Sequence, residues 1–375
     1  MSEERQGTTR DQDITRGQDI TRGQDITRAQ DITRDQGTAR GHDETGGQDI
    51  TRAELMSRPT PLEPAPRLAR AIGLEPEDLW VKRDDLIGLG GGGNKVRKLE
   101  WTAGAARAEG ATTLVTSGAA QSNHARLTAA AGARLGMDVV LVLAGAPTDG
   151  MTGNIALDGL FGARVVWAGE VSETELAAAV DDVARDLRER GARPAVIPFG
   201  GSSALGALGY VAAGTELLVQ DPDLTTAVVA VGSGGTMAGL VHALGAERVL
   251  GVHCGAVADP EHTVGDLVEG LAGQPAATSP RLHLDQVGPG YSALTEPVMD
   301  AITTAARTEG IVLDPIYTGR ALAGLIAAVH DGQVRPGQRT VFVHTGGLPG
   351  LFGHPEILER ARSAVADTAV RWPRG

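Results

Sequence analysis

The sequence predicts an α/β protein with two open parallel-sheet, three-layer domains and an active-site cleft between them. Short β-branched runs alternate with longer Ala- and Leu-rich stretches, which is typical of parallel sheets connected by helices. The runs are apolar throughout and do not alternate in polarity, as strands covered on both faces require. At least eight such runs follow each other, which indicates two sheets: "LWVKR", "TTLVTSG", "VVLVLAG", "RVVWAG", "AVIPFGG", "AVVAVGSGG", "VLGVHC" and "TVFVHTGG".

The clearest helix is expected from Val171 to Arg190. Ser172 and Glu175 have the spacing of a capping box, and Gly191 stands where a helix commonly stops. Its apolar positions fall on one helical face, as an amphipathic helix requires: Leu176, Val180, Val183 and Leu187.

The N-terminal part differs from the rest of the chain. "QDITR" occurs five times between residues 12 and 52, in a hexapeptide register. Each repeat offers at most one isoleucine, which buries too little apolar surface to offset the entropy lost on ordering. We therefore expect residues 1–55 to be a disordered repeat tail. It is either a native flexible tail or a translated repeat upstream of a true start at Met56.

Composition excludes several classes of function. The net charge of −13 argues against an extended nucleic-acid surface, which needs clustered cations. The single cysteine, Cys254, excludes an intrachain disulfide framework and is expected to be a small buried residue. No His, Asp or Glu cluster has metal-ligand spacing, so no metal is predicted. No run of about 18 apolar residues occurs, and the cytoplasm is the expected location.

Three predicted strands end in small hydrogen-bonding residues: "TSGAAQSNH", "VGSGGT" and "HTGG". Ligands of open parallel sheets bind at the carboxyl ends of the strands, so these loops favour one shared site. The turn Gly232–Thr236 follows a buried strand and opens a helix, which is typical of a cradle for a phosphate group. It lacks the lysine of the ATP-binding loop, so backbone amides would hold a phosphate monoester.

Lysine is scarce in this chain. Only Lys82, Lys95 and Lys98 occur, and Lys95 directly follows the glycine run "GLGGGGN". Unlike arginine, lysine can lose its proton when desolvated and attack a carbonyl group. With a phosphate cradle nearby, this predicts pyridoxal 5′-phosphate (PLP), held by Lys95 as a Schiff base. Lys98 lies one turn further on and faces the same anion, whereas Lys82 is expected to be structural or a surface strand residue.

Several segments together resemble one known family. "LWVKRDDLIGLGGGGNKVRKLEW", "LVTSGAAQSNHARLTAAAGARLGM", "VIPFGGSSALGALGYV", "VGSGGTMAGL", "LDPIYTGRALAGLI" and "VFVHTGGLPGLFG" are similar to the D-cysteine desulfhydrase and 1-aminocyclopropane-1-carboxylate (ACC) deaminase family. That family belongs to the PLP-dependent enzymes of fold type II, the tryptophan-synthase-β-like fold. The resemblance covers about residues 58 to 355 in order.

The resemblance implies a role for each matching residue. Lys95 would be the catalytic Schiff-base lysine, and Ser122, Tyr291 and Tyr317 would be catalytic as well. Substrate contacts would come from the catalytic serine and tyrosines with Gln121 and Asn123, whereas His124 would orient the loop. Besides Lys95, the implied cofactor-binding residues are Lys98, Asn123, Ser233, Gly234, Gly235, Thr236 and Thr345.

Two positions discriminate within the family. ACC deaminases resemble "YEG" at the second tyrosine and carry a leucine before the paired glycines; here Thr318 and Thr345 stand in these places. A Thr345 hydroxyl beside the pyridine nitrogen would leave that nitrogen largely unprotonated. This favours α,β-elimination of D-cysteine to pyruvate, ammonia and hydrogen sulfide. ACC deaminase and L-cysteate sulfo-lyase remain as alternatives, as do a PLP-binding pseudoenzyme and, on the weak G-x-G-x-x-G match, a nicotinamide oxidoreductase.

The resemblance also implies the organisation of the chain. Residues 56–97 and 209–375 would form a large PLP-binding domain, and residues 98–208 a small α/β domain. Family precedent favours a homodimer acting on a small amino acid, with no nucleic-acid or membrane partner.

Overall fold

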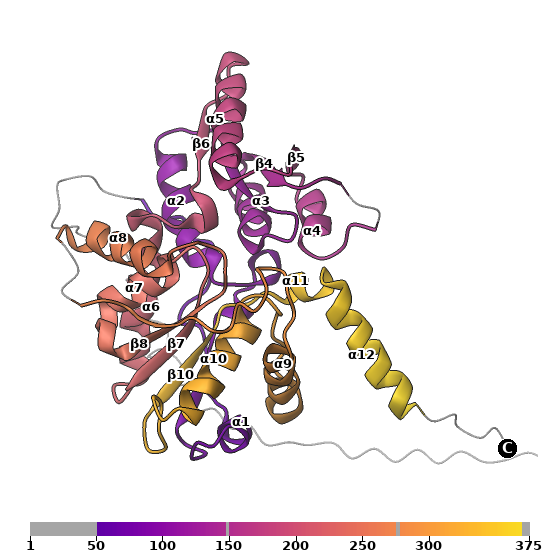
Figure 1. The fold of residues 1–375 in the computed structure, drawn as a ribbon. Helices are drawn as coiled ribbons and strands as arrows, with labels where there is room; N and C mark the ends of the chain where they lie inside the picture. Colours follow the sequence, from indigo (N-terminus) through magenta and orange to yellow (C-terminus); the bar gives the residue numbers. More distant parts are fainter. Residues whose placement is uncertain (1–50, 148–149, 275–277, 370–375) are drawn as a thin grey trace, which may run out of the picture. The chain divides into compact units, whose positions relative to one another are not determined.

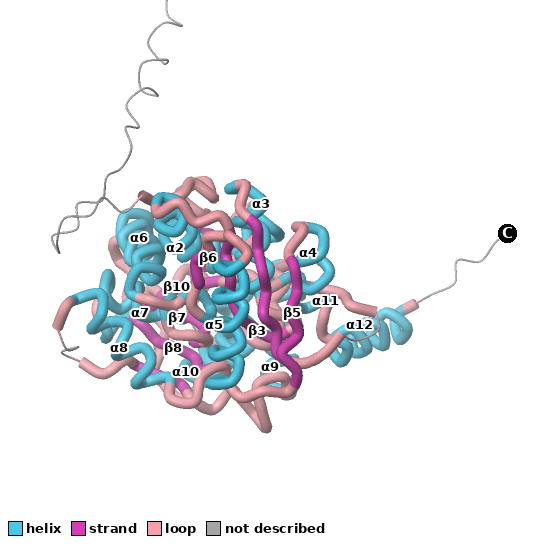
Figure 2. Tube along the Cα trace, turned by 90° about the horizontal axis from the view of Figure 1, so that it is seen from above, coloured by secondary structure: helices cyan, strands magenta, loops and turns pink. Residues whose placement is uncertain are grey.

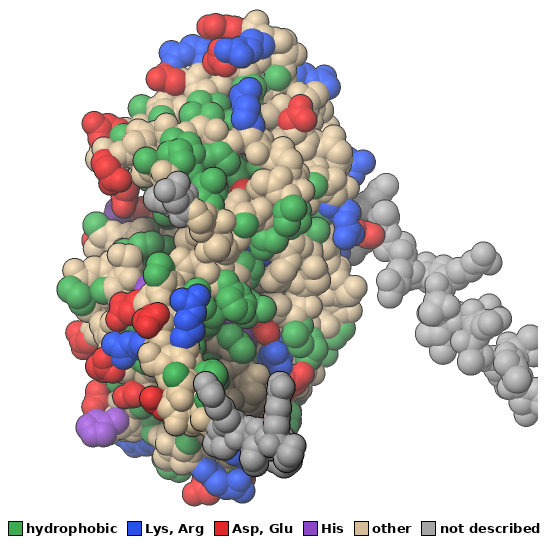
Figure 3. Space-filling view, turned by 90° about the vertical axis from the view of Figure 1, so that its right-hand side faces the viewer, with side chains coloured by type: hydrophobic (Ala, Val, Ile, Leu, Met, Phe, Trp, Pro, Cys, Tyr) green, Lys and Arg blue, Asp and Glu red, His purple; other side chains and the backbone are tan. Residues whose placement is uncertain are grey.

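The computed structural model describes residues 51–147, 150–274 and 278–369. The predicted tail therefore lies outside the described residues, except for its last five. The described chain contains two sheets with helices packed on them, as Figures 1 and 2 show. Both signs of charge occur on the face in Figure 3, with many charged side chains at the top of the view, where α5 (Glu173–Glu189) stands in Figure 1.

The larger sheet has six strands in the order β1-β2-β10-β7-β8-β9. Its strands are parallel except for β1, which is antiparallel to β2 at one edge. In the centre, Phe342 pairs with Val81 on one side and with Val228 on the other. The strands are β1 (Leu62–Pro64), β2 (Leu79–Arg83), β7 (Thr226–Val231), β8 (Val249–His253), β9 (Arg281–His283) and β10 (Thr340–His344).

The smaller sheet has four parallel strands in the order β5-β4-β3-β6. They are β3 (Thr113–Ala119), β4 (Asp138–Ala144), β5 (Arg164–Gly169) and β6 (Pro194–Val196). All eight apolar runs of the sequence form strands, which confirms the predicted fold class. The sequence analysis missed β1 and β9 because each has only three residues, too few for a periodic pattern.

Helices cover both faces of each sheet, which gives the predicted three layers twice. One face of the larger sheet packs on α1, α9 and α10, and the other on α6, α7 and α8. The smaller sheet lies between α2, α3 and α4 on one face and α5 on the other. The helices are α1 (Pro66–Ala71), α2 (Lys95–Ala108), α3 (Asn123–Leu135), α4 (Asn154–Leu160), α5 (Glu173–Glu189), α6 (Ala204–Gln220), α7 (Gly235–Leu244), α8 (Pro260–Ala272), α9 (Glu296–Glu309), α10 (Thr318–His330), α11 (Leu348–Phe352) and α12 (Pro355–Thr368), with short 3-10 turns at 84–86, 89–91, 199–201 and 246–248.

Helix α5 forms as the sequence predicts. Ser172 is its N-cap and makes the full capping box with Glu175, and Gly191 follows the helix with a φ of +85°. Val180 and Leu187 on its apolar face are buried against the smaller sheet. The capping residues and the apolar stripe together determine where this helix begins and which face it buries.

Buried charges fix α2, the helix that begins with Lys95. Arg97 on α2 is fully buried and binds both oxygens of Asp84, at 2.8 and 2.9 Å. Arg97 also binds Glu216 of α6, and Glu216 in turn pairs with Lys82 of β2. Lys82 is therefore structural and buried, not a surface residue. Because a buried charge is costly without a partner, this network holds α2 in one position.

The segment 51–55 differs from the predicted tail. The backbone N–H of Ala53 donates to the carbonyl of Glu100 at 2.7 Å, and Leu55 N–H donates to the Glu100 side chain at 3.0 Å. Ala53 and Leu55 are both buried in the core beneath α2. These residues are apolar and fall after the last repeat, so they pack with the following chain.

The described residues form one compact unit. The chain passes from the larger sheet to the smaller one between β2 and β3, and it returns between β6 and β7. The predicted boundaries near residues 97 and 208 lie inside helices α2 and α6 of these connections, and not in loops. The division into a large domain (56–97 and 209–375) and a small one (98–208) remains a prediction.

Candidate active site

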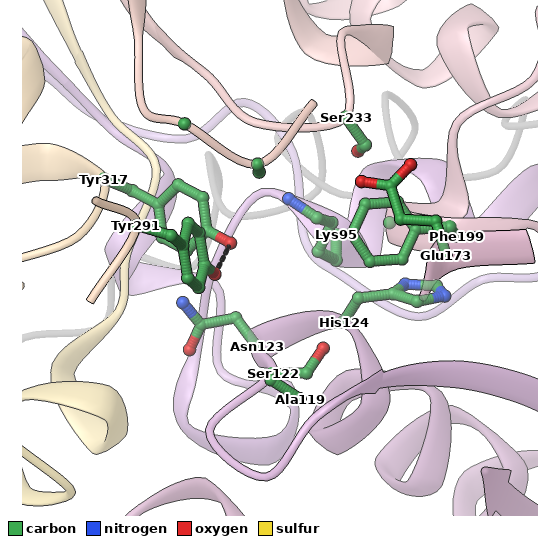
Figure 4. Close-up of a pocket in the computed structure, with 13 residues that line it drawn as sticks. Lys95, Ala119, Ser122, Asn123, His124, Glu173, Phe199, Ser233, Tyr291 and Tyr317 are labelled. Carbon is green, nitrogen blue, oxygen red and sulfur yellow. Dashed lines mark hydrogen bonds between the residues drawn. The ribbon is translucent and has the colours of Figure 1, made fainter. Parts of the chain in front are cut away.

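A cavity of about 270 Å³ lies where the carboxyl ends of strands from both sheets meet. Lys95 stands near its centre, with the two tyrosines on one side and Glu173, Phe199 and His124 on the other (Figure 4). The lining residues are Lys95, Ala119, Ser122, Asn123, His124, Glu173, Phe199, Gly200, Ser233, Gly255, Ala256, Tyr291 and Tyr317. The structure thus brings together two of the three predicted strand ends in this cavity, and the third, at Thr345, lines an adjoining pocket with Lys95.

Lys95 is the first residue of α2, and its side chain enters the cavity. Its Nζ donates to the Asn94 side-chain oxygen at 3.2 Å and lies 5.9 Å from the ring centroid of Tyr317. Burial lowers the pKa of Lys95 to about 8, with Arg126 adding to the effect and Asp314 opposing it. The amine is therefore a usable base and nucleophile near neutral pH.

The predicted phosphate cradle lies beside Lys95. Asn94 links the two, because its side-chain N–H donates to Thr236 Oγ1 at 3.0 Å. The turn leads from β7 into α7, whose first N–H groups have no partner within the helix. Gly235 keeps the turn open: a Cβ there would come within 2.7 Å of Ser202 Oγ and 3.1 Å of Lys98 Nζ.

Lys98 lies next to the cradle and is almost completely buried, 1% exposed. Its Nζ donates to Ser202 Oγ at 2.9 Å and to the Gly200 carbonyl at 3.3 Å. Burial, aided by Lys95, lowers the pKa of Lys98 well below its usual value. Among the described residues no carboxylate forms an ion pair with it. A buried amine without a carboxylate partner at an amide-lined turn is a site for an anion, whose negative charge would favour the ammonium form.

The loop after β3 supplies Ser122 and Asn123, which both line the cavity. Ser122 is the N-cap of α3: its oxygen accepts the Ala125 N–H at 3.1 Å, which leaves the hydroxyl hydrogen free to donate. The structure places Gln121 differently from the prediction. Its side-chain N–H donates to the Thr152 carbonyl and its oxygen accepts the Asn154 N–H, so this amide holds the neighbouring loop and does not line the cavity.

Tyr291 and Tyr317 face each other across one side of the cavity. Their hydroxyl oxygens are 2.5 Å apart, and their rings meet edge to face at 70°. Asp314 accepts the backbone N–H of Tyr317 at 2.9 Å, and Arg320 holds the loop of Tyr291 by donating to the Gly290 carbonyl at 3.0 Å. Burial raises the pKa of Tyr291 to about 12 and that of Tyr317 well above its usual value, so both phenols stay protonated at neutral pH.

The two threonines that distinguish this chain lie at different depths. Thr345 follows β10 and lines a small inner extension of the cavity, together with Lys95, Lys98 and Ser233. Thr318 is fully buried, and its hydroxyl lies 2.7 Å from Asp314 Oδ1. Thr345 is therefore the one that a bound ring could contact.

Four site residues with polar or aromatic side chains were not assigned a role in the sequence analysis: Asn94, Glu173, Phe199 and Ser202. Ser202 Oγ contacts Ser233 Oγ at 2.8 Å and accepts the Gly235 N–H at 3.2 Å, so it belongs to the cradle. The segment "PFGGSS" follows a strand and contains paired glycines, the same signal that marked the other loops. Glu173 carries no such signal, because only the packing of the two sheets brings it to the cavity.

The donors of the cavity fit PLP. The phosphate group of PLP could accept hydrogen bonds from the amides of residues 233–236, from the hydroxyls of Ser202 and Ser233 and from the buried Lys98 ammonium. The aldehyde matches the Lys95 amine, which Asn94 connects to the cradle. Small residues leave the room that a flat ring needs: a Cβ on Gly232 would come within 2.9 Å of the Tyr317 ring. Fold and site thus define a PLP-dependent enzyme of fold type II.

Comparison with known proteins agrees with this class. Residues 53–346 match the model of the pyridoxal-phosphate dependent enzyme family. The D-cysteine desulfhydrases of Salmonella schwarzengrund (strain CVM19633) and Salmonella typhi are each 40% identical over 320 residues, covering 81% of this chain and 96% of theirs. The chain therefore belongs to the pyridoxal-phosphate dependent enzymes, in the family that contains the D-cysteine desulfhydrases, and its cofactor is PLP.

Solved structures support the same assignment. A crystal structure described as an ACC deaminase homologue has a TM-score of 0.77 and 36% identity, covering 83% of this chain and 96% of that one. The processed form of threonine deaminase isoform 2 from Solanum lycopersicum has a TM-score of 0.59 at 18% identity, which concerns the fold alone.

The described residues contain neither a membrane-spanning helix nor a cluster of metal ligands. None of the helices in this part of the chain is long and apolar enough to cross a membrane. Within the same residues, no three His, Cys, Asp or Glu side chains are grouped so that they could hold a metal ion.

Proposed function

We propose that this protein catalyses the α,β-elimination of D-cysteine to pyruvate, ammonia and hydrogen sulfide. One observation carries the proposal: the Lys95 amine and two protonated phenols share a cavity whose inner end is lined by Thr345, with no acid in that position. A neutral hydroxyl beside the ring nitrogen gives a mild electron sink, which suits a good leaving group such as thiolate. The curated relatives at 40% identity carry the same activity in their names.

The residues that would hold the cofactor follow from the donor set. Lys95 would bind it covalently, the 233–236 turn with Ser202 and Lys98 would hold the phosphate, and Asn123 and Thr345 would contact the ring. When bound, PLP withdraws electrons from the substrate α-carbon and so weakens its C–H bond.

The protein's own groups then position the substrate and move protons. The Ser122 hydroxyl and the Asn123 amide are donors for the substrate carboxylate. Lys95, with a pKa lowered to about 8, takes the α-proton. Tyr291 and Tyr317, joined through their hydroxyls, donate hydrogen bonds to the substrate and assist its proton transfers. Loss of hydrogen sulfide leaves 2-aminoacrylate, and the released product hydrolyses to pyruvate and ammonia.

The direct test replaces Lys95 by alanine. Wild-type protein purified with PLP is expected to show the visible absorption band of the bound cofactor and to release pyruvate and sulfide from D-cysteine. Lys95→Ala is expected to lose both, because no other described amine lines the main cavity. A colourless wild-type protein that takes up no PLP would refute the proposal. An unchanged melting temperature of the variant controls for folding.

The substrate is decided by a panel of D-cysteine, L-cysteine, L-cysteate and ACC, with the 2-oxo acid, ammonia and sulfide measured for each. D-cysteine is expected to be the best substrate. Equal turnover of ACC would contradict the argument from Thr345, and a preference for L-cysteate would make the enzyme a sulfo-lyase. The homodimer and the cytoplasmic location also remain predictions; light scattering after size exclusion tests the first.

A further inference from the structure

One side of the cavity presents hydrogen-bond acceptors. His124, Glu173 and Phe199 lie together on the side of Lys95 opposite the tyrosines (Figure 4). We call the His124 imidazole and the Glu173 carboxylate the acceptor wall. The proposed function assigns it no role, and the sequence analysis expected His124 only to orient the loop.

The hydrogen bonds of Thr116 determine the tautomer of His124. Thr116 Oγ1 lies 2.8 Å from the Ile197 carbonyl and 2.9 Å from His124 Nε2. A carbonyl oxygen can only accept, so the single hydroxyl hydrogen of Thr116 goes to Ile197. The hydroxyl oxygen must then accept a hydrogen from His124 Nε2. His124 therefore carries its proton on Nε2, and Nδ1 has a free lone pair.

This lone pair has no partner within the protein. His124 is 3% exposed and lines the cavity, and its Nδ1 makes no hydrogen bond among the described residues. Burial, together with the positive charges of Lys95 and Lys98, lowers the pKa of His124 well below its usual value, so the ring is neutral. An unsatisfied buried acceptor costs roughly 1–3 kcal/mol, which a donor on a bound molecule would recover.

Glu173 adds a negative charge to the same side. It is the first residue of α5, an exposed position where the helix dipole favours a carboxylate. That structural reason does not explain why its side chain lines the cavity, whereas Glu175 in the same turn bonds Ser172 outside it. Among the described residues that line the main cavity, Glu173 is the only one with a carboxylate.

We propose that the acceptor wall selects the β-substituent of the substrate: it admits a neutral group that donates a hydrogen bond, such as a thiol, and rejects an anionic sulfonate. The two lysines do not cancel this effect. Lys95 lies between the wall and the tyrosines, and Lys98 is bound to Ser202 and Gly200 beside the phosphate cradle. This inference rests on the proposed function, since it concerns the leaving group of that reaction.

The charge of the wall is tested with Glu173→Gln and a matched pair of substrates. D-cysteine and D-cysteate have the same chirality and differ only in thiol against sulfonate. Wild-type holoenzyme is expected to prefer D-cysteine. Glu173→Gln is expected to raise the ratio of kcat/KM for D-cysteate to kcat/KM for D-cysteine roughly tenfold, because it removes the repulsion between one carboxylate charge and the sulfonate in a partly solvated cavity. Glu175→Gln makes the same change in the same helical turn outside the cavity and should leave the ratio unaltered.

The lone pair is tested with His124→Gln and with S-methyl-D-cysteine, a neutral substrate without an S–H donor. Glutamine keeps an N–H for Thr116 but has nothing at the Nδ1 position. The variant is expected to lose kcat/KM for D-cysteine several-fold more than for S-methyl-D-cysteine. Thr116→Val, which removes the acceptor of the Nε2 hydrogen, should shift the ratio in the same direction if His124→Gln fails to fold.

Nitrogen-15 NMR of histidine-labelled holoenzyme tests the tautomer without any assay of activity. The expected result is a proton on Nε2 of His124 and none on Nδ1. A proton on Nδ1, or an unchanged substrate ratio in both Glu173→Gln and His124→Gln, would overturn the inference while the lyase activity stands. If D-cysteine gives no pyruvate, the proposed function fails instead. The relative affinities of D-cysteine and D-cysteate, measured from the visible spectrum, then decide the selectivity.

Discussion

At the scale of single residues, Asn94 explains why the glycine run ends in Asn-Lys. One side-chain amide accepts from Lys95 Nζ and donates to Thr236 in the phosphate cradle. The reactive amine and the anion site are therefore held at a fixed separation by one residue. An aspartate in this place would instead raise the pKa of the lysine, because it would add a negative charge beside the ammonium.

The lowered pKa of Lys95 predicts how the apoprotein takes up PLP. Only the neutral amine attacks an aldehyde, and its pKa in the folded protein lies at about 8 instead of 10.5. The rate of covalent uptake, followed by absorbance after mixing, is expected to rise as the pH increases through about 8 and then to level off. Asn94→Asp should move this midpoint upward. A midpoint near 10 in the wild type would contradict the burial argument.

At the scale of elements, the site depends on strand ends followed directly by helices. The turn between β7 and α7 and the loop between β3 and α3 have this form, and each reaches the cavity. Small residues let the backbone approach a ligand, and the first N–H groups of the helices remain free to bind an anion. These loops were predictable because strand, turn and helix signals stand next to each other in the sequence.

Gly235→Ala tests the phosphate cradle. Its Cβ would lie 2.7 Å from Ser202 Oγ, and displacing this neighbour is expected to weaken PLP binding by roughly 1–3 kcal/mol. Equilibrium dialysis against PLP measures the affinity. Gly159→Ala is the control: Gly159 lies in α4, and an added Cβ there meets nothing within 4 Å. Equal affinities of the two variants would show that the turn does not hold the cofactor.

At the scale of the whole molecule, the two sheets must keep a fixed relation because the cavity takes residues from both. Helices α2 and α6 join the sheets, and the buried group of Asp84, Arg97 and Glu216 ties these helices together. The same helices contain the predicted domain boundaries. The structure thus gives a physical reason for treating α2 as the element that positions Lys95.

Two truncations test where the folded unit begins. Removing residues 1–50 is expected to leave the free energy of unfolding unchanged, if the repeat is a tail. Removing residues 1–55 also deletes buried Leu55 and the donor to buried Glu100, and should cost roughly 2–4 kcal/mol. Urea unfolding of both proteins with PLP bound measures the difference. Equal stability would contradict the role of the 53–55 segment in the folded core.

The sequence by itself determined eight of the strands and the caps of α5, because each depends on neighbours within a few residues. For the same reason it predicted the turn at 232–236 and Lys95 as parts of one site. Tertiary structure alone decided which of these segments meet. Lys82 and Lys98 are buried only in the folded protein, and the Gln121 amide bonds there to the loop at 152–154. Glu173 and Phe199 likewise reach the cavity only through the packing of the two sheets. These contacts join residues far apart in the chain, and their energy depends on burial and on charges that no local pattern records.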